Sequence, residues 1–317
     1  MPGDESRSRV HSKDYFGDGR DYWWNADYLA FLARERWKVS GGAALPGAAS
    51  RMALDVGTGF GHFMRALAPA LPPETQWVGI DPEAESIKEA HARTLAVSPE
   101  LARRARFRLG RAEAIPFHDG VFDFVACQTV LIHVRDPEVA LREMIRVLAP
   151  GGLLVVVEPD NLAAGFAFES RATGATADEI VALFRLQLLC ERGKKALGEG
   201  DNSLGAELPG ALARLGLELV DVALNDRAYS MIPPYVRPHE RAELADLERL
   251  TDAGHFVWRY EDTERYYVAG GGKREELPAL WELARRERTR IRSAIAEKRW
   301  SAGGGHVTYV VAGRKPR

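Results

Sequence analysis

Three glycines spaced two residues apart follow an apolar run near position 50. The run Met52–Val56 has the pattern of a buried strand, and Gly57, Gly59 and Gly61 come after it. Glycine adopts positive φ angles and lets a ligand approach the main chain, because it has no Cβ. The helix expected next points its free N–H groups toward the same place. The turn therefore predicts a binding site for a nucleotide-like ligand.

An acid ends the next predicted strand, Trp77–Asp81, twenty residues after Gly61. In doubly wound sheets a carboxylate at this place accepts hydrogen bonds from ribose hydroxyls. A nicotinamide site favours G-x-G-x-x-G, whereas this chain has G-x-G-x-G with Asp55 two residues before the first glycine. The spacing therefore favours a ribose-bearing cofactor other than a nicotinamide dinucleotide.

This combination resembles the class I, Rossmann-like S-adenosylmethionine-dependent methyltransferases. Residues 110–117 look like the segment that passes the adenine ring in this family, and residues 119–128 look like its fourth strand. Residues 146–159 look like its fifth strand with the preceding helix and turn. Together the blocks cover roughly residues 50 to 160. The resemblance implies methyl transfer from S-adenosyl-L-methionine to a nitrogen, oxygen or carbon of a small organic metabolite or short peptide, with S-adenosyl-L-homocysteine as product.

The resemblance also implies which residues hold the cofactor. Asp81 is expected to bind the ribose hydroxyls, and Asp55 either stands near the methionyl end or ties down the glycine turn. Ala112 and Glu113 match the pair at the adenine edge, although Glu113 also fits a solvated loop. The predicted cofactor-binding residues are Tyr22, Asp55, Gly57, Thr58, Gly59, Gly61, Asp81, Pro82, Ala112, Glu113, Gln128, Thr129 and His133.

Methyl transfer is an in-line displacement in which positioning alone contributes about 7–11 kcal/mol, so the sequence need not show a strong base. His133 is a candidate general base, or else a wall of the cofactor pocket. Glu158, which ends the fifth strand, is a candidate for orienting an amine or hydroxyl, or for a salt bridge within a loop. The Asp160–Asn161 pair resembles the magnesium-dependent catechol-type enzymes, but Cys127 and Gln128 stand where those enzymes need an acid. No metal is therefore expected.

Aromatic residues are dense between positions 13 and 38, where a helical pattern runs from about Asn25 to Trp37. Tyr22, Trp23 and Trp24 are candidates for a lid in which an indole face meets the sulfonium by cation–π attraction. Aromatic residues at helical spacing are equally typical of a plain core. Both interpretations stay open.

Five predicted strands alternate with helical patterns, which indicates an α/β fold with a parallel sheet, helices on both faces and right-handed crossovers. These strands lie near 51–56, 76–81, 104–109, 122–127 and 152–158. The resemblance implies a Rossmann-like sheet of seven strands, mostly parallel, in which the antiparallel last strand (306–313) pairs with the strand at 217–222. Outside the sheet we expect a loop at 160–177 and helices at about 178–195, 208–215, 238–253 and 275–298.

The predicted organisation has a core interrupted by a mainly helical cap. An aromatic lid (1–48) precedes the core (49–160), which continues at 203–224 and ends with a last strand at 304–317. Two insertions, 161–202 and 225–303, are expected to form the cap together with the N-terminal helix, over the carboxyl ends of the strands.

Composition limits the function classes. The 317 residues are 46% hydrophobic and carry a formal charge of −2, which excludes a disordered chain and gives no basic face for nucleic acid. No apolar stretch approaches the roughly 20 residues that span a bilayer, and the polar start lacks a secretory signal, so a cytoplasmic protein without a membrane partner is expected. The two cysteines, Cys127 and Cys190, predict buried thiols.

Two alternatives stay open from the residues alone. A methyltransferase that acts on a macromolecule needs an open or basic groove, and a non-catalytic protein that binds S-adenosylmethionine needs only the cofactor cradle. The sequence does not predict the oligomeric state.

Overall fold

The computed structural model describes Arg20 and residues 22–39, 51–168, 174–226, 228–255 and 257–317, and these fall into two units. The core unit comprises Trp24–Ala163, Lys194–Arg227 and His306–Arg317. The helical unit comprises Ala164–Gly193 and Ala228–Gly305, with the described residues that precede Trp24. Each unit is described by itself.

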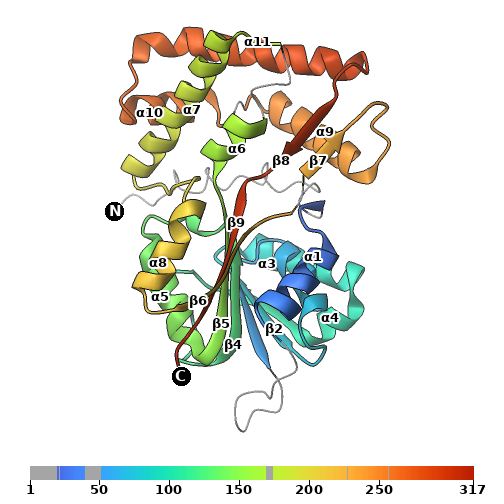
Figure 1. The fold of residues 1–317 in the computed structure, drawn as a ribbon, viewed down its shortest axis with the longest axis vertical. Helices are drawn as coiled ribbons and strands as arrows, with labels where there is room; N and C mark the ends of the chain where they lie inside the picture. Colours follow the sequence, from blue (N-terminus) through green and yellow to red (C-terminus); the bar gives the residue numbers. More distant parts are fainter. Residues whose placement is uncertain (1–19, 21, 40–50, 169–173, 227, 256) are drawn as a thin grey trace. The chain divides into compact units, whose positions relative to one another are not determined.

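Within the described residues of the core unit, seven strands form one sheet in the order β3-β2-β1-β4-β5-β9-β6 (Figure 1). Their bounds are β1 Met52–Val56, β2 Gln76–Asp81, β3 Ala105–Leu109, β4 Phe122–Gln128, β5 Leu148–Pro159, β6 Glu218–Leu224 and β9 Thr308–Arg314. The first five strands pair in parallel, and β9 is antiparallel to both β5 and β6. The predicted fold class is confirmed.

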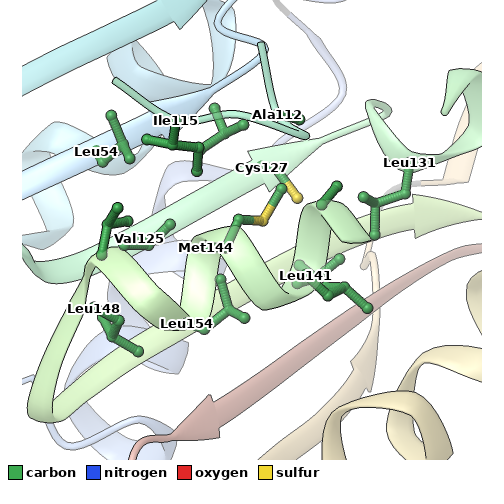
Figure 2. Close-up of a cluster of buried hydrophobic side chains, with 14 of the residues drawn as sticks. Leu54, Ala112, Ile115, Val125, Cys127, Leu131, Leu141, Met144, Leu148 and Leu154 are labelled. Atoms are coloured by element: carbon green, nitrogen blue, oxygen red, sulfur yellow. The ribbon is translucent and has the colours of Figure 1, made fainter. Parts of the chain in front are cut away.

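Helices cover both faces of this sheet, which explains why its central strands are continuous apolar runs. One face packs against α5 (Pro137–Val147) and α8 (Leu208–Arg214), where Leu141 and Met144 of α5 lie among buried strand residues (Figure 2). Asp136 caps α5, since its side chain accepts hydrogen bonds from the N–H groups of Glu138 and Val139.

The N-terminal helix packs on the other face of the sheet. It consists of α1 (Ala26–Phe31) and a π-helical turn (Leu32–Arg36), and it shares a buried apolar cluster with α2 (His62–Leu67) and α4 (Pro99–Arg104). Trp37, which follows the turn, is fully buried there. The predicted helix is correct, but its assignment to the cap is wrong, because its apolar stripe is part of the core unit. The remaining core helix is α3 (Ala84–Val97).

The helical unit has a small core of its own. Its elements are most of α6 (Asn161–Phe168) and of α7 (Ala177–Ala196), with α9 (Pro238–Asp252), α10 (Tyr260–Ala269), α11 (Leu277–Ala296), β7 (Ala228–Met231) and β8 (Ala302–Gly305). The buried residues at its centre are Leu186, Cys190, Trp258, Tyr266, Tyr267 and Leu277. None of the helices in the described residues is both long and apolar enough to cross a membrane.

Three features differ from the sequence expectations for this part of the chain. A helix, α6, begins where a loop was expected, and neither α10 nor the antiparallel β7–β8 pair was predicted. The sequence of β8 is Ala-Gly-Gly-Gly, in which apolar and polar side chains do not alternate. Only its pairing with β7 therefore defines it as a strand. The predicted first insertion also extends too far, since residues from Lys194 onward belong to the core unit. Residues 1–19 and 40–48 of the predicted lid lie outside the described residues.

Candidate functional site

The glycine turn joins β1 to α2 at the carboxyl edge of the parallel strands. Gly57, Gly59 and Gly61 have φ angles of +65°, +50° and +79°, which L side chains rarely adopt. Space is restricted as well, because a Cβ on Gly57 would lie 2.4 Å from Cγ2 of Val130. Gly57 is therefore required both by the backbone conformation of the turn and by the close approach of Val130.

Asp55 ties the turn to the end of β1. It is buried, and its Oδ2 accepts a 2.6 Å hydrogen bond from Oγ1 of Thr58. Burial, with a contribution from the negative charge of Asp81, raises the pKa of Asp55 to about 7. This supports the second of the two roles expected for Asp55, that of a group that holds the turn.

The raised pKa of Asp55 predicts a pH-dependent stability. Folded Asp55 keeps its proton up to about pH 7, whereas the unfolded chain loses it near pH 4, so the folded state binds more protons between these values. The free energy of unfolding should therefore fall as the pH rises through this window. We expect the stability of the wild type relative to Asp55→Asn to fall between about pH 4 and pH 7. Above pH 7 the difference between the two proteins should stay constant. Urea denaturation at several pH values measures this, and a constant difference contradicts it.

Asp81 faces the same turn from the end of β2. Its Oδ2 accepts a hydrogen bond from the N–H of Gly59 at 3.0 Å, and its Oδ1 accepts one from the N–H of Glu83 at 3.0 Å. A carboxylate has about four acceptor positions, so it can hold the turn and a ligand hydroxyl together. Pro82 follows on the surface. The structure thus brings Asp81 and the glycines together, as the ribose prediction requires.

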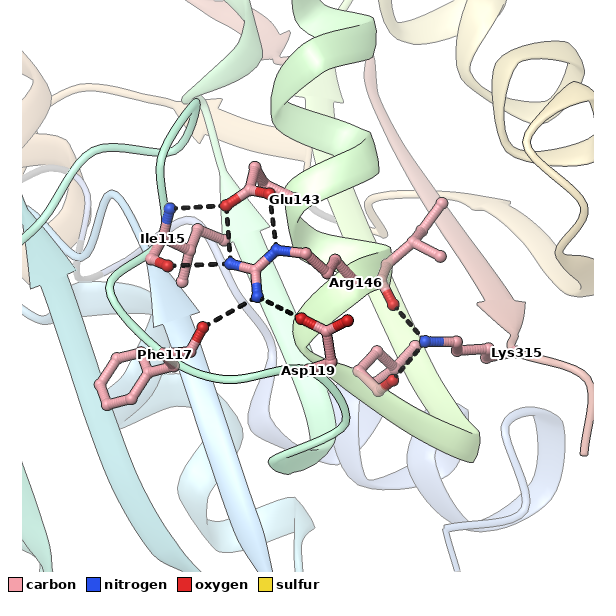
Figure 3. Close-up of polar contacts among 8 residues, drawn as sticks. Ile115, Phe117, Asp119, Glu143, Arg146 and Lys315 are labelled. Atoms are coloured by element: carbon pink, nitrogen blue, oxygen red, sulfur yellow. Dashed lines mark hydrogen bonds and ion pairs between the residues drawn. The ribbon is translucent and has the colours of Figure 1, made fainter.

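The segment expected at the adenine edge is held by one arginine of α5 (Figure 3). Arg146 binds both carboxylate oxygens of Glu143 and donates to the carbonyl oxygens of Ile115 at 3.0 Å and Phe117 at 2.9 Å. It also pairs with Asp119 at 2.7 Å. These contacts, with Glu143, fix the backbone of the segment that carries the other two predicted residues.

Those two residues are Ala112 and Glu113. Ala112 is buried, and the carboxylate of Glu113 lies 3.3 Å from the guanidinium of Arg111. The contact with Arg111 fits the alternative of a loop carboxylate for Glu113. The adenine-edge role of both residues stays a prediction.

Replacing Arg146 with lysine should lower the free energy of unfolding by about 1–2 kcal/mol. Lysine keeps the charge but has one nitrogen in place of the planar fork, so it cannot reach Glu143 and both carbonyl oxygens together. Arg142→Lys on the same helix is the matched control, since exposed Arg142 pairs with Glu138 alone and should change stability by less than about 0.5 kcal/mol. Equal losses in urea denaturation would contradict the prediction.

Trp24 contacts the end of β4 from the N-terminal segment. Its Nε1 donates to Oε1 of Gln128 at 3.2 Å, and its ring stacks on Phe63 of α2 with centroids 5.6 Å apart. The predicted residue Gln128 therefore lies beside an aromatic side chain of the leader. Tyr22 and Trp23 belong to the helical unit, so the predicted cofactor contact of Tyr22 stays a prediction.

The loop after β4 holds Thr129 and His133. Thr129 has a φ angle of +53°, and its N–H donates to the carbonyl oxygen of Val157 at 2.9 Å. A short 3₁₀ helix, η6 (Leu131–His133), follows and ends at partly exposed His133. The strained Thr129 backbone brings the loop back over the glycine turn, where Val130 packs on Gly57. The role of His133 as base or pocket wall stays a prediction.

Glu158 holds the start of the loop after β4. It is fully buried, and its Oε1 accepts hydrogen bonds from the N–H groups of Val130 at 2.9 Å and Leu131 at 2.8 Å. Burial raises the pKa of Glu158 to about 7, against the backbone hydrogen bonds and the positive charge of Lys194. These contacts fit the alternative of a residue that holds a loop, and the role of Glu158 toward an acceptor stays a prediction.

Sequence reasoning missed Lys194, a buried residue near the end of α7. Its Nζ donates to the carbonyl oxygen of Ile132 at 2.9 Å. The signal that could have found it is its spacing, since Lys194 continues the buried helical stripe of Leu186 and Cys190. A lysine in such a stripe needs buried partners.

No metal cluster is evident in the described part of the chain, where no three His, Cys, Asp or Glu side chains are arranged to hold an ion. Cys127 and Cys190 are buried free thiols, as predicted.

Comparisons with known proteins agree with this geometry. Residues 54–156 match the family model described as "Methyltransferase domain". The chain is 39% identical to an uncharacterised protein in a transposon of Streptomyces fradiae, over 37% of this chain and 32% of that one. It is 37% identical to an uncharacterised methyltransferase of Schizosaccharomyces pombe, over 35% and 41% of the two chains. It is 34% identical to the ubiquinone/menaquinone biosynthesis C-methyltransferase of Geobacter sulfurreducens, over 41% and 50%. The chain thus spans half or less of the length of each relative.

Proposed function

We propose that this chain, whose residues 54–156 form a methyltransferase domain of the class I S-adenosylmethionine-dependent family, transfers a methyl group to a small organic metabolite or short peptide. The observation that carries the proposal is the glycine turn facing Asp81. Three glycines with positive φ angles form the turn at the carboxyl edge of the sheet, and the carboxylate of Asp81 lies 3.0 Å from the N–H of Gly59. Ligands of open α/β sheets bind at this edge.

The residues present fit S-adenosylmethionine. Asp81 would accept hydrogen bonds from the ribose hydroxyls, because a carboxylate has acceptor positions beyond the two that the N–H groups of Gly59 and Glu83 use. The bound cofactor supplies an electrophilic methyl group on a sulfonium. Trp24 and Gln128, which contact each other beside the turn, would border the methionyl part.

The protein's own residues would contribute mainly by positioning. Asp55 and Thr58 hold the turn, and Glu158 holds the loop that carries His133. His133 would line the pocket or accept a proton from the acceptor. We propose a small acceptor because the relative from Geobacter sulfurreducens is named for quinone biosynthesis. The protein would act in the cytoplasm.

Calorimetry with S-adenosylhomocysteine tests the cofactor, with micromolar binding expected. Transfer of a labelled methyl group from S-adenosylmethionine is then followed on a panel of quinols, phenols, amines and short peptides, with proteins and nucleic acids as a separate set. Label on the small molecules supports the proposal, whereas label only on macromolecules contradicts it. Cofactor binding without transfer to either set favours a non-catalytic binding protein.

A further inference from the structure

A buried ammonium lies beneath the loop after β4. Lys194 is only 1% exposed, and its Nζ donates to the carbonyl oxygen of Ile132 at 2.9 Å and to Oδ1 of Asn202. A charged group out of water is costly unless it is hydrogen-bonded and paired with an opposite charge. The two hydrogen-bond acceptors, the Ile132 carbonyl oxygen and Oδ1 of Asn202, provide this stabilisation. The positive charge of Lys194 also acts to lower the pKa of Glu158 against the larger effect of burial.

Lys194 and Glu158 hold opposite ends of the same short helix. Glu158 accepts hydrogen bonds from the N–H groups of Val130 and Leu131, at the start of η6. Lys194 donates to the carbonyl oxygen of Ile132, one residue further along the chain. The carboxylate of Glu158 therefore holds the loop through two of its N–H groups, and the ammonium of Lys194 holds it through a carbonyl oxygen.

The segment after α7 packs directly on the same loop. Gly200 has a φ angle of +99°, and a Cβ there would lie 2.0 Å from the carbonyl oxygen of Ile132. The neighbouring Asn202 is buried and accepts the second hydrogen bond from Lys194. Gly200 thus packs against the carbonyl group that Lys194 binds, and Asn202 supplies the second acceptor.

The loop that these groups hold lies against the proposed cofactor site. Val130 is the side chain that fills the space beside Gly57, where a Cβ would lie 2.4 Å from its Cγ2. Thr129, with its positive φ angle, and Gln128, which binds Trp24, directly precede it. A shift of η6 would therefore move Val130 relative to the glycine turn.

We propose that Lys194 is a positioning residue of the cofactor site, which holds the loop 129–133 against the glycine turn from beneath. The inference rests on the proposed function, because it assigns Lys194 a role in binding S-adenosylmethionine. Lys194 does not touch the cofactor in this role. It acts through the carbonyl oxygen of Ile132 and through Val130.

Three variants of the full chain test the role. Lys194→Met removes the ammonium and keeps an unbranched side chain of similar length. Lys195→Met is the matched control, because Lys195 is the next residue of α7 but pairs at the surface with Asp201 and Glu207. The third variant is the double substitution Lys194→Met/Glu158→Gln. It removes the buried carboxylate together with the buried ammonium, so it should fold even if Lys194→Met does not.

Two measurements are made on each folded variant: calorimetric affinity for S-adenosylhomocysteine, and hydrogen exchange of residues 129–133 without ligand. We expect roughly 10-fold weaker binding and faster exchange for Lys194→Met, because a hydrogen bond to a charged group is lost. Lys195→Met should match the wild type in both. The double variant should recover thermal stability but not affinity, since the Ile132 carbonyl still lacks its donor.

The outcomes separate the two hypotheses. Wild-type affinity and exchange in Lys194→Met and in the double variant would overturn the positioning role and leave the proposed function in place. Recovery of affinity together with stability in the double variant would also overturn it, because Lys194 would then only neutralise Glu158. A wild-type protein that binds no S-adenosylhomocysteine would contradict the proposed function, and the exchange of residues 129–133 would still decide whether Lys194 holds the loop.

Discussion

Replacing Gly57 with alanine should lower the free energy of unfolding by about 2–5 kcal/mol. The φ angle of +65° costs an L residue about 1–2 kcal/mol. The added methyl group would lie 2.4 Å from Cγ2 and 3.3 Å from Cβ of Val130, so rotation of the valine side chain does not remove the clash, and overpacking costs about 1–3 kcal/mol more. Urea denaturation of the two proteins measures the difference.

Gly216→Ala separates the two causes. Gly216 follows α8 in the same core unit with a φ angle of +85°, but a Cβ there would meet no atom within 4 Å. Its replacement should therefore cost only the backbone strain, about 1–2 kcal/mol. Equal losses for Gly57→Ala and Gly216→Ala would show that the close packing of Val130 contributes nothing.

Asp81→Ala should weaken binding of S-adenosylhomocysteine by roughly 10- to 150-fold. A hydrogen bond to a charged group contributes about 1.5–3 kcal/mol, which corresponds to this range of affinity. Part of the lost affinity would result from a less well fixed glycine turn, because Asp81 also accepts the hydrogen bond of the Gly59 N–H. Calorimetry on the folded variant gives the affinity.

Glu83→Ala is the matched control for Asp81. Glu83 is an exposed acid two residues further along, and only its main-chain N–H contacts Asp81, so its replacement should leave the affinity unchanged. An Asp81→Ala protein that is folded and binds as tightly as the wild type would remove Asp81 from the site. An equal loss for Glu83→Ala would point to a general effect of negative charge.

Local sequence patterns predicted the parts of the protein that depend on neighbours along the chain. Apolar runs such as Met52–Val56 are typical of buried strands, and their alternation with helices indicates a parallel sheet, so the carboxyl ends of β1 and β2 meet at one edge. The glycines and Asp81 follow these two ends directly. Their meeting was therefore predictable without coordinates.

The contacts between groups that are distant in the sequence depend on tertiary packing and could not be predicted. The N-terminal helix was expected in the cap, but its apolar stripe packs on the sheet, and Trp24 reaches Gln128 across 104 residues of sequence. Lys194 and Ile132 are 62 residues apart, and nothing local indicates that they meet. Glu158 holds the start of η6 through two N–H groups, a contact that its place in the sequence does not indicate. Periodicity reports which face of an element is buried, whereas the partner of a buried charge depends on how the elements pack together.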